Sequence, residues 1–402
     1  MKANESEPKG EVVMTHVISK SKVAWAIACA ALLCTALLVG CSSSSSSSKS
    51  ASASSASASA SASSASASSA AAGETRTFTD SAGRTVEIPA NIEKVAASGS
   101  SSQQILLTIA PDMLVGLTED LNEGELKYFG DQYSSLPVFG QIYGGKGNFN
   151  KEAIAAASPQ LIIDIGEAKD SIVEDLDELQ ESIGIPCVHI EASLGSYDEA
   201  YTLLGELLGK EDRAAELAAY CKSAYEEVES TVAAIPESDR VKAAYLLGDA
   251  GLNAMAKTSF QAAIIDMCAD NVVVLEKAGG SGLGSEVSFE QVALWDPQLI
   301  VFGPGSIYAT AGDDETWQTL TAIQNHNYYE VPGQPFNWMS TPPSVNQVMG
   351  LQWFARLCYP DKFDTDIATV TKSYYKTFYG YDMTDEEAAE FLANSLPTKA
   401  AE

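Results

Sequence analysis

The sequence contains one stretch twice. Residues 149–165 read FNKEAIAAASPQLIIDI, and residues 287–303 read VSFEQVALWDPQLIVFG. The tetrapeptide Pro-Gln-Leu-Ile stands at the same place in both copies, and a constant offset of 138 residues (290 − 152) also aligns Glu152 with Glu290. Self-similarity at so long a spacing indicates repeated architecture. We therefore expect two similar lobes.

Each copy has the pattern of a short helix, a stop and a buried strand. Asn150 and Ser288 are residue types that cap helix N-termini, and Ser-Pro or Asp-Pro then ends the helix before an apolar run. A glutamate in the first turn is favoured by the helix dipole alone, typically by about 0.3 to 1 kcal/mol. Helix-proline-strand joints also occur in unrelated α/β proteins. The positions of Glu152 and Glu290 therefore have a purely structural explanation beside any functional one.

The N-terminal part of the chain has the features of an export signal. Two lysines precede the apolar run 23–39, which is followed by Leu-Val-Gly-Cys ending at Cys41. This ending resembles a bacterial lipobox, which implies a signal peptide over residues 1–40 and a lipid on Cys41. The alternative is an uncleaved membrane anchor, because the run is near the minimum spanning length. Both place the remainder outside the cytoplasmic membrane, and whether Met1 or Met14 initiates the chain stays open.

Residues 41–73 form the predicted tether, since those after Cys41 are nearly all serine and alanine. Such a composition has too little apolar surface to offset the entropy of ordering it. The whole chain has 24 Lys and Arg against 54 Asp and Glu, a net charge of −30. A negative field of this size argues against nucleic acid and against an anionic membrane surface as partners.

Four cysteines remain after the signal and Cys41 are set aside: Cys187, Cys221, Cys268 and Cys358. They are far apart and none belongs to a Cys-x-x-Cys pair, so neither a zinc knuckle nor a redox motif is indicated. Three stand in apolar contexts, which favours buried free thiols. A single disulfide in an exported protein stays open.

The body alternates short apolar runs with amphipathic helical patterns. This alternation predicts parallel sheets covered on both faces. A hairpin is expected over 78–89, and strands over 94–97, 161–165, 186–190, 242–247, 272–275, 299–302 and 328–331. The predicted parts are an N-terminal lobe over 74–205, one long connecting helix over 206–237, a C-terminal lobe over 238–395 and a tail over 396–402.

Four segments carry a resemblance to a known family: TDSAGRTVEIP at 79–89, NKEAIAAASPQLII at 150–163, SFEQVALWDPQLIV at 288–301 and NWMSTPPSVNQVMGLQWFARLCYP at 337–360. They resemble the helix-hinged (class III) substrate-binding lipoproteins of ABC importers for iron-siderophore, haem and cobalamin. The resemblance covers essentially all of 75–395. It implies an α/β fold of two Rossmann-like lobes with parallel sheets, joined by a single long α-helix, with the ligand cleft between them.

The resemblance also gives the two repeated glutamates a role. In the family, the glutamate of each lobe motif pairs with arginines on one half of a permease dimer that works with a cytoplasmic ATPase. Glu152 and Glu290 are therefore the expected permease-docking residues of a monomeric, lipid-anchored binding protein. Two carboxylates on separate lobes would fix the register of such a complex by charge complementarity.

The ligand is expected at loops that follow the carboxyl ends of strands, as in other open α/β sheets. Aromatic side chains there would suit a bulky, flat or chelated ligand. The candidate ligand-binding residues are Ser100, Ser101, Tyr143, Lys146, Asn253, Lys257, Tyr308, Trp338 and Met339.

Direct metal binding and catalysis both lack sequence support. Only His189 and His326 stand in the body; His189 falls in an expected core strand, and His326 could at most cap a chelate. Neither a Gly-x-Ser-x-Gly elbow nor a phosphate-binding Gly-rich loop occurs, and no cofactor is indicated. A sensor or adhesin and a tethered hydrolase are the rival classes. Arginine is scarce in the C-terminal lobe, so an iron-siderophore or haem complex, cobalamin, a nickel chelate and molybdate all stay open.

Overall fold

The computed structural model describes residues 74–142, 148–277, 279 and 282–397, all within one compact unit. The predicted signal peptide, Cys41 and the serine-alanine tether lie outside the described residues. Within the described part, no helix is both long enough and apolar enough to cross a lipid bilayer.

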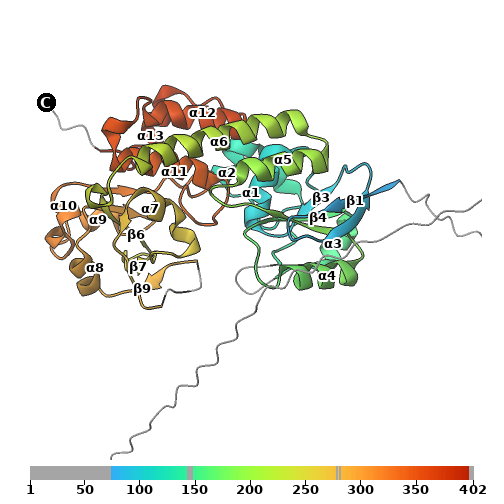
Figure 1. Cartoon of the computed structure of the whole chain (residues 1–402), viewed down its shortest axis with the longest axis horizontal. Coiled ribbons are helices and arrows are strands. Elements are labelled where there is room, and N and C mark those ends of the chain that lie inside the picture. Colours follow the sequence, from blue (N-terminus) through green and yellow to red (C-terminus); the bar gives the residue numbers. More distant parts are fainter. Residues whose placement is uncertain (1–73, 143–147, 278, 280–281, 398–402) are drawn as a thin grey trace, which may run out of the picture. The chain divides into compact units, whose positions relative to one another are not determined.

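The first lobe is built on a short parallel sheet (Figure 1). Its three strands follow the order β3-β4-β5, and the antiparallel hairpin of β1 and β2 stands beside them, as the alternating pattern predicted. The strands are β1 (Thr75–Thr79), β2 (Thr85–Pro89), β3 (Val95–Ala97), β4 (Leu161–Gly166) and β5 (Cys187–Glu191). Its helices are α1 (Ser100–Ile109), α2 (Glu123–Phe129), α3 (Lys151–Ala157) and α4 (Ile172–Ile183).

The second lobe has a mixed sheet, whereas the sequence predicted a parallel one. Its order is β11-β10-β6-β7-β9, with β8 also beside β6, and β7 and β9 run antiparallel to their neighbours. The chain reverses after β6 because Gly248 and Gly251 have positive φ angles of 77° and 66° and Gly251 donates a backbone hydrogen bond to Gly248. The strands are β6 (Lys242–Leu247), β7 (Asn253–Ala254), β8 (Asp270–Asn271), β9 (Ser285–Glu286), β10 (Leu299–Phe302) and β11 (Tyr328–Glu330).

The strand predicted over 272–275 is wrong in position, since β8 ends at Asn271. The helices of this lobe are short. They are α7 (Ala263–Cys268), α8 (Phe289–Trp295), α9 (Tyr308–Ala311) and α10 (Thr321–Gln324).

A helix of 23 residues, α6 (Glu211–Ala233), links the two sheets and runs along both lobes in Figure 1. The helical pattern that begins in the preceding segment belongs to a separate helix, α5 (Tyr197–Leu208). Gly209 separates them with a φ of 65°, a left-handed conformation that ends α5.

Three C-terminal helices accompany α6: α11 (Asn346–Cys358), α12 (Ile367–Tyr379) and α13 (Asp385–Phe391). The last two also reach the first lobe. The ring of Tyr128 in α2 lies 5.2 Å from that of Tyr375 and 4.9 Å from that of Tyr381. Lys127 Nζ lies 3.2 Å from a carboxylate oxygen of Glu387. The C-terminal segment therefore packs against the first lobe as well as the second.

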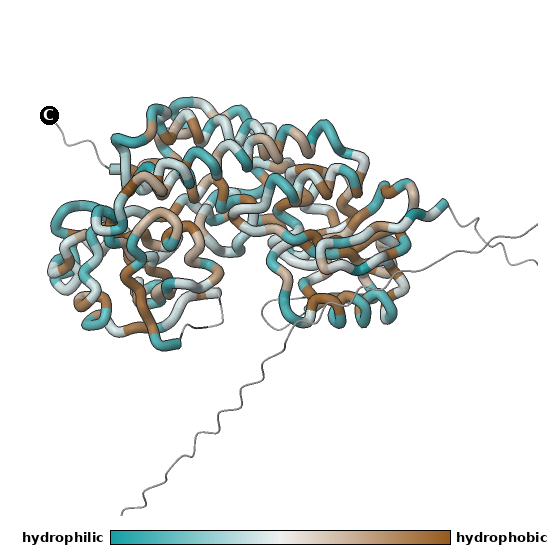
Figure 2. The backbone as a smooth tube through the Cα atoms, viewed as in Figure 1, coloured by the Kyte–Doolittle hydropathy of each residue, from teal (hydrophilic) through white to brown (hydrophobic). Residues whose placement is uncertain are grey.

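The two repeated strands turn equivalent residues to equivalent sides. Leu161 of β4 and Leu299 of β10 lie in a large core shared with α6, α11 and α12, whereas Ile162 and Ile300 face two separate smaller cores. Figure 2 shows apolar segments in both lobes and helices of mixed polarity. Alternation along a strand explains the split, because successive side chains point to opposite faces.

Candidate functional site

The two repeated helix starts have matching geometry. Asn150 Oδ1 accepts a hydrogen bond from the backbone N–H of Ala153 at 2.9 Å, and Ser288 Oγ accepts from Gln291 at 3.3 Å. Each bond satisfies a backbone donor that a helix start leaves free. Both helices end in a left-handed residue, Ser158 or Asp296, directly before the proline.

Glu152 and Glu290 occupy the first turns of α3 and α8, and both are exposed. The pKa of Glu290 is lowered because its own backbone N–H and the Ser288 hydroxyl stabilise the charged form. The sequence predicted both positions, and the structure places each carboxylate on the surface of a different lobe.

A cavity of about 660 Å³ lies between the lobes. The first lobe contributes Gln104 from the middle of α1, the loop before α2 and the beginning of α2. The second contributes the segments that follow the carboxyl ends of β6, β10 and β11. The lining residues are Gln104, Glu119, Asp120, Asn122, Glu125, Leu247, Gly248, Asn253, Leu283, Pro304, Gly333, Pro335, Phe336, Asn337, Thr341 and Pro342.

A second cavity of about 450 Å³ shares Pro342 with the first. It is formed by the ends of β3 and β4 and by the start of α1, and Phe260 of the second lobe reaches it. Ser100 and Ser101 line this cavity, but they stand in the first turn of α1 and not in the loop that the sequence predicted. The hydroxyl of Ser101 donates to the carbonyl of Pro343 at 3.0 Å, so it also ties the first lobe to the 341–344 segment.

Of the other predicted ligand residues that the structure describes, Asn253 alone borders the interlobe cavity. Lys257 pairs with Asp270 at 3.2 Å, and the ring of Tyr308 packs on that of Tyr328 at 5.7 Å. Neither lines the two cavities. Tyr143 and Lys146 lie outside the described residues.

The prediction for Trp338 and Met339 needs correction. They are 1 % and 0 % exposed, and Trp338 packs on Trp353 and Phe391 with ring centroids 6.2 and 5.6 Å away. Asn337 causes this, because its side-chain oxygen accepts the backbone N–H groups of Met339 and Ser340 and turns the chain inward. The preceding pair, Phe336 and Asn337, lines the cavity instead.

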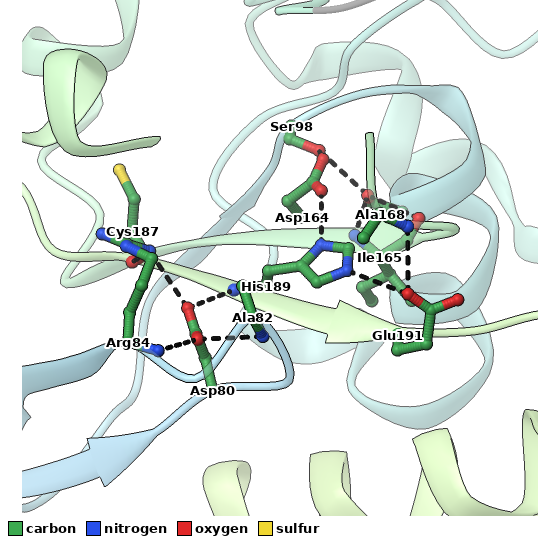
Figure 3. Close-up of polar contacts among 11 residues, drawn as sticks. Asp80, Ala82, Arg84, Ser98, Asp164, Ile165, Ala168, Cys187, His189 and Glu191 are labelled. Atoms are coloured by element: carbon green, nitrogen blue, oxygen red, sulfur yellow. Dashed lines mark hydrogen bonds and ion pairs between the residues drawn. The ribbon is translucent and has the colours of Figure 1, made fainter. Parts of the chain in front are cut away.

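The sequence did not predict a network of buried side chains that borders the second cavity (Figure 3). His189 Nδ1 lies 2.8 Å from Asp164 Oδ2, and the Ser98 hydroxyl donates to the other oxygen of Asp164. Asp80 accepts the backbone N–H of His189 at 3.1 Å and pairs with Arg84 at 3.0 Å. The residue types were visible in the sequence, but their proximity depends on the pairing of β4 with β5.

This network does not have the order of contacts that activates a serine nucleophile. The carboxylate of Asp164 lies between Ser98 and His189, so the imidazole does not contact the hydroxyl. Burial lowers the pKa of His189, but hydrogen bonds and charge from Asp164 and Glu191 outweigh burial and raise it overall. The arrangement favours a charged histidine that stabilises β4 and β5.

The four body cysteines are free and buried. For Cys187, Cys268 and Cys358 this confirms the expectation from their apolar contexts. Among the described residues, no three His, Cys, Asp or Glu side chains are grouped so that they could hold a metal ion. His326 has a left-handed conformation after α10 and is not among the residues that line the two cavities.

Comparison with known proteins gives the family. A family model described as periplasmic binding protein matches residues 95–335. The chain belongs to the periplasmic binding protein family. Membership indicates an extracytoplasmic protein, and it agrees with the two-lobed α/β fold and the interlobe cavity.

Solved structures of ABC-transporter binding proteins share the fold. An ABC transporter solute-binding protein from Sulfurospirillum deleyianum is 29 % identical, with a TM-score of 0.73 over 79 % of this chain and 99 % of that one. A molybdate-binding protein of Haemophilus influenzae is 18 % identical, with a TM-score of 0.61 over 77 % and 99 %. A Helicobacter pylori protein solved as a nickel–histidine complex is 17 % identical, with a TM-score of 0.58 over 79 % and 99 %. No curated protein matches the sequence significantly.

Proposed function

We propose that this protein is the lipid-anchored, monomeric binding component of an ABC importer, which captures a metal chelate between its lobes and delivers it to a permease dimer. The observation that carries the proposal is the interlobe cavity in a periplasmic binding protein fold whose two lobes each present an exposed glutamate. The solute-binding role of the 29 % identical Sulfurospirillum protein supports it.

The permease contact is proposed from the repeated helix starts. Glu152 and Glu290 stand in short helices that are capped in the same way and joined to strands in the same register. A carboxylate on each lobe lets a partner with two basic patches sense the spacing of the lobes, and it also speeds encounter by charge attraction. Cys41 and the serine-alanine segment would tether the protein near the membrane.

The cargo is proposed to be a chelate because the cavity of about 660 Å³ suits a small molecule rather than a bare ion. Iron-siderophore and haem complexes are the leading candidates, with cobalamin, a nickel chelate and molybdate as alternatives. The fold alone does not choose among them, since molybdate and a nickel–histidine complex occur in structural relatives below 20 % identity.

The test measures both the uptake of a metal chelate by cells and its binding by the purified protein. Cells lacking this protein should lose high-affinity accumulation of one radiolabelled metal chelate and regain it on complementation. The purified chain should bind the same chelate in a one-to-one complex and release it unchanged. Normal accumulation of every chelate by the deletion strain would contradict a transport role, and chemical turnover of the bound molecule would favour the hydrolase.

A further inference from the structure

Charge is distributed unevenly between the two walls of the interlobe cavity. The wall from the first lobe carries the carboxylates Glu119, Asp120 and Glu125. The residues that line it from the second lobe have no ionisable side chain, and they include the apolar Leu247, Pro304 and Phe336. A ligand in this cavity therefore meets negative charge on one side and a neutral surface on the other.

Among the described residues, no cation pairs with these three carboxylates. The arginines of the body are used elsewhere: Arg84 pairs with Asp80 and Asp177, Arg213 with Glu216, and Arg356 with Glu227. Neither Arg76 nor Arg240 borders the cavity. The negative wall is thus left without an internal counter-charge in the part of the chain that the structure describes.

Glu125 is partly buried and lies near Glu119, and both facts act on its pKa. Burial is the main cause that raises the pKa of Glu125, the Asn122 backbone N–H opposes it, and the charge of Glu119 raises it further. Asn122 and Glu125 are also joined in a capping box, which fixes the position of Glu125 at the start of α2.

A buried amide provides an independent indication of a ligand. Gln104 lines the same cavity and is 2 % exposed, and its Oε1 has no hydrogen-bond partner. Its neighbour Gln103 is satisfied, because Gln103 Oε1 accepts from the backbone N–H and the hydroxyl of Thr118. A buried acceptor without a donor is costly and uncommon, so its presence at a cavity wall indicates that a ligand donor satisfies it.

We propose that the interlobe cavity selects metal chelates of zero or positive net charge, whose cationic, hydrogen-bond-donating edge lies against Glu119, Asp120, Glu125 and Gln104. The apolar part of the chelate would then cover Leu247, Pro304 and Phe336 on the opposite wall. This inference rests on the proposed function and narrows its ligand class. It sets hydroxamate-type chelates and corrinoids above ferric catecholates, haem and molybdate.

The physical reason is electrostatic, because the carboxylates attract a cationic chelate and repel an anionic one. A pair of unit charges about 6 Å apart changes an equilibrium roughly threefold in water-like surroundings and about a hundredfold at an effective dielectric constant of 20. Three carboxylates therefore penalise an anionic chelate several times over, and the described lining residues include no arginine to offset them. Proteins that bind anionic ligands usually provide such arginines.

The test is calorimetric titration of the purified full-length chain with chelates chosen by charge. Ferrioxamine B carries one positive charge, ferrichrome and cyanocobalamin carry none, and a ferric tricatecholate, haem and molybdate are anionic. We expect a cationic or neutral chelate to bind at least about a hundredfold more tightly than any anion in the set. Raising the ionic strength should weaken binding of the cation and leave the neutral chelates nearly unchanged.

Matched variants separate a charge effect from damage to the fold. Combining Glu119→Gln, Asp120→Asn and Glu125→Gln removes the charge while glutamine at 125 can still close the capping box. This variant should bind ferrioxamine B at least about tenfold more weakly and a neutral chelate within about threefold of the parent. The control combines Glu174→Gln, Glu211→Gln and Glu386→Gln, three exposed helix-start residues that do not line the cavity, and should change neither affinity.

The outcomes distinguish this inference from the proposed function. Tight binding of an anionic chelate, or a cation affinity that survives the cavity variant, would overturn the charge selection while the transport role stands. Absence of binding by every chelate in the set would overturn both. Preference for the cation or neutral chelate, lost only in the cavity variant, would support both.

Discussion

Gln160 and Gln298 make the same hydrogen bond in the two lobes. The side-chain oxygen of each accepts the backbone N–H of the residue at the start of the neighbouring strand, Lys94 in one lobe and Lys242 in the other, at 3.0 Å in both cases. Each glutamine also donates its own backbone N–H to the carbonyl of the same lysine at 2.8 Å. The glutamine of the repeated Pro-Gln-Leu-Ile segment is thus the residue that aligns adjacent strands.

The two glutamines differ in how many further bonds they make, which leads to the first prediction. Gln160 also accepts from the backbone N–H of Glu93 and donates to the carbonyl of Asn91, whereas Gln298 makes only the one side-chain bond. Gln160→Ala should therefore lower the free energy of unfolding by about 1 to 3 kcal/mol, and Gln298→Ala by about 0.5 to 1.5 kcal/mol. Urea denaturation followed by circular dichroism measures both. A larger loss for Gln298→Ala would be inconsistent with this account of the repeat.

Much of the architecture could be predicted because the sequence signals in the repeated segment act over short distances along the chain. Capping residues, proline stops and apolar runs act within a few residues, so the helix and strand of each copy could be placed from the sequence. The antiparallel β7 and β9 could not be placed in this way, because their direction depends on the turn at Gly248 and Gly251 and on the pairing of β7 with β6. Tertiary pairing overrides local pattern at that point.

The candidate site was harder to predict than the fold, because a sequence pattern does not say which way a side chain points. The sequence places Trp338 in a loop near the cavity, but the bonds of Asn337 to the next backbone N–H groups turn Trp338 into the core. The acidic wall was not predicted either, since Glu119 and Glu125 stand in a stretch where acidic residues are common. Their significance depends on the neutral surface that faces them across the cavity.

The four body thiols should be unreactive in the folded protein. Burial raises the pKa of Cys187 and that of Cys268 to about 12, and it also raises the pKa values of Cys221 and Cys358. Because the thiolate is the reactive form, alkylation by iodoacetamide at pH 8 should be negligible until the protein is unfolded. Peptide mapping by mass spectrometry measures each site separately. Rapid labelling of any of the four in the native state would show that the core opens more readily than this packing allows.

His189 should make stability fall with rising pH. Its pKa is raised in the folded state, so the protonated form contributes stability that is fully present below the unfolded value of about 6.5 and is lost as the pH rises through the folded value. Urea unfolding between pH 5.5 and 8.5 should show this decrease for the parent and a smaller one for His189→Gln. A steeper decrease in the variant would mean that other groups control the pH dependence.

The central claim is that the two lobes present a loaded cleft to a membrane partner through Glu152 and Glu290. Both carboxylates are exposed and neither lines the cavities, so removing them should not disturb ligand binding. The matched control removes Glu174 and Glu386, two exposed glutamates in the first turns of other helices.

Uptake of the bound chelate by cells that carry Glu152→Ala with Glu290→Ala tests this claim most directly. We expect ligand affinity within about twofold of the parent and uptake reduced at least about tenfold, because charge pairs at such contacts govern both encounter and register. The control with Glu174→Ala and Glu386→Ala should transport normally. Parental uptake by the Glu152 and Glu290 double variant would contradict the docking role and with it the account of why the segment is repeated.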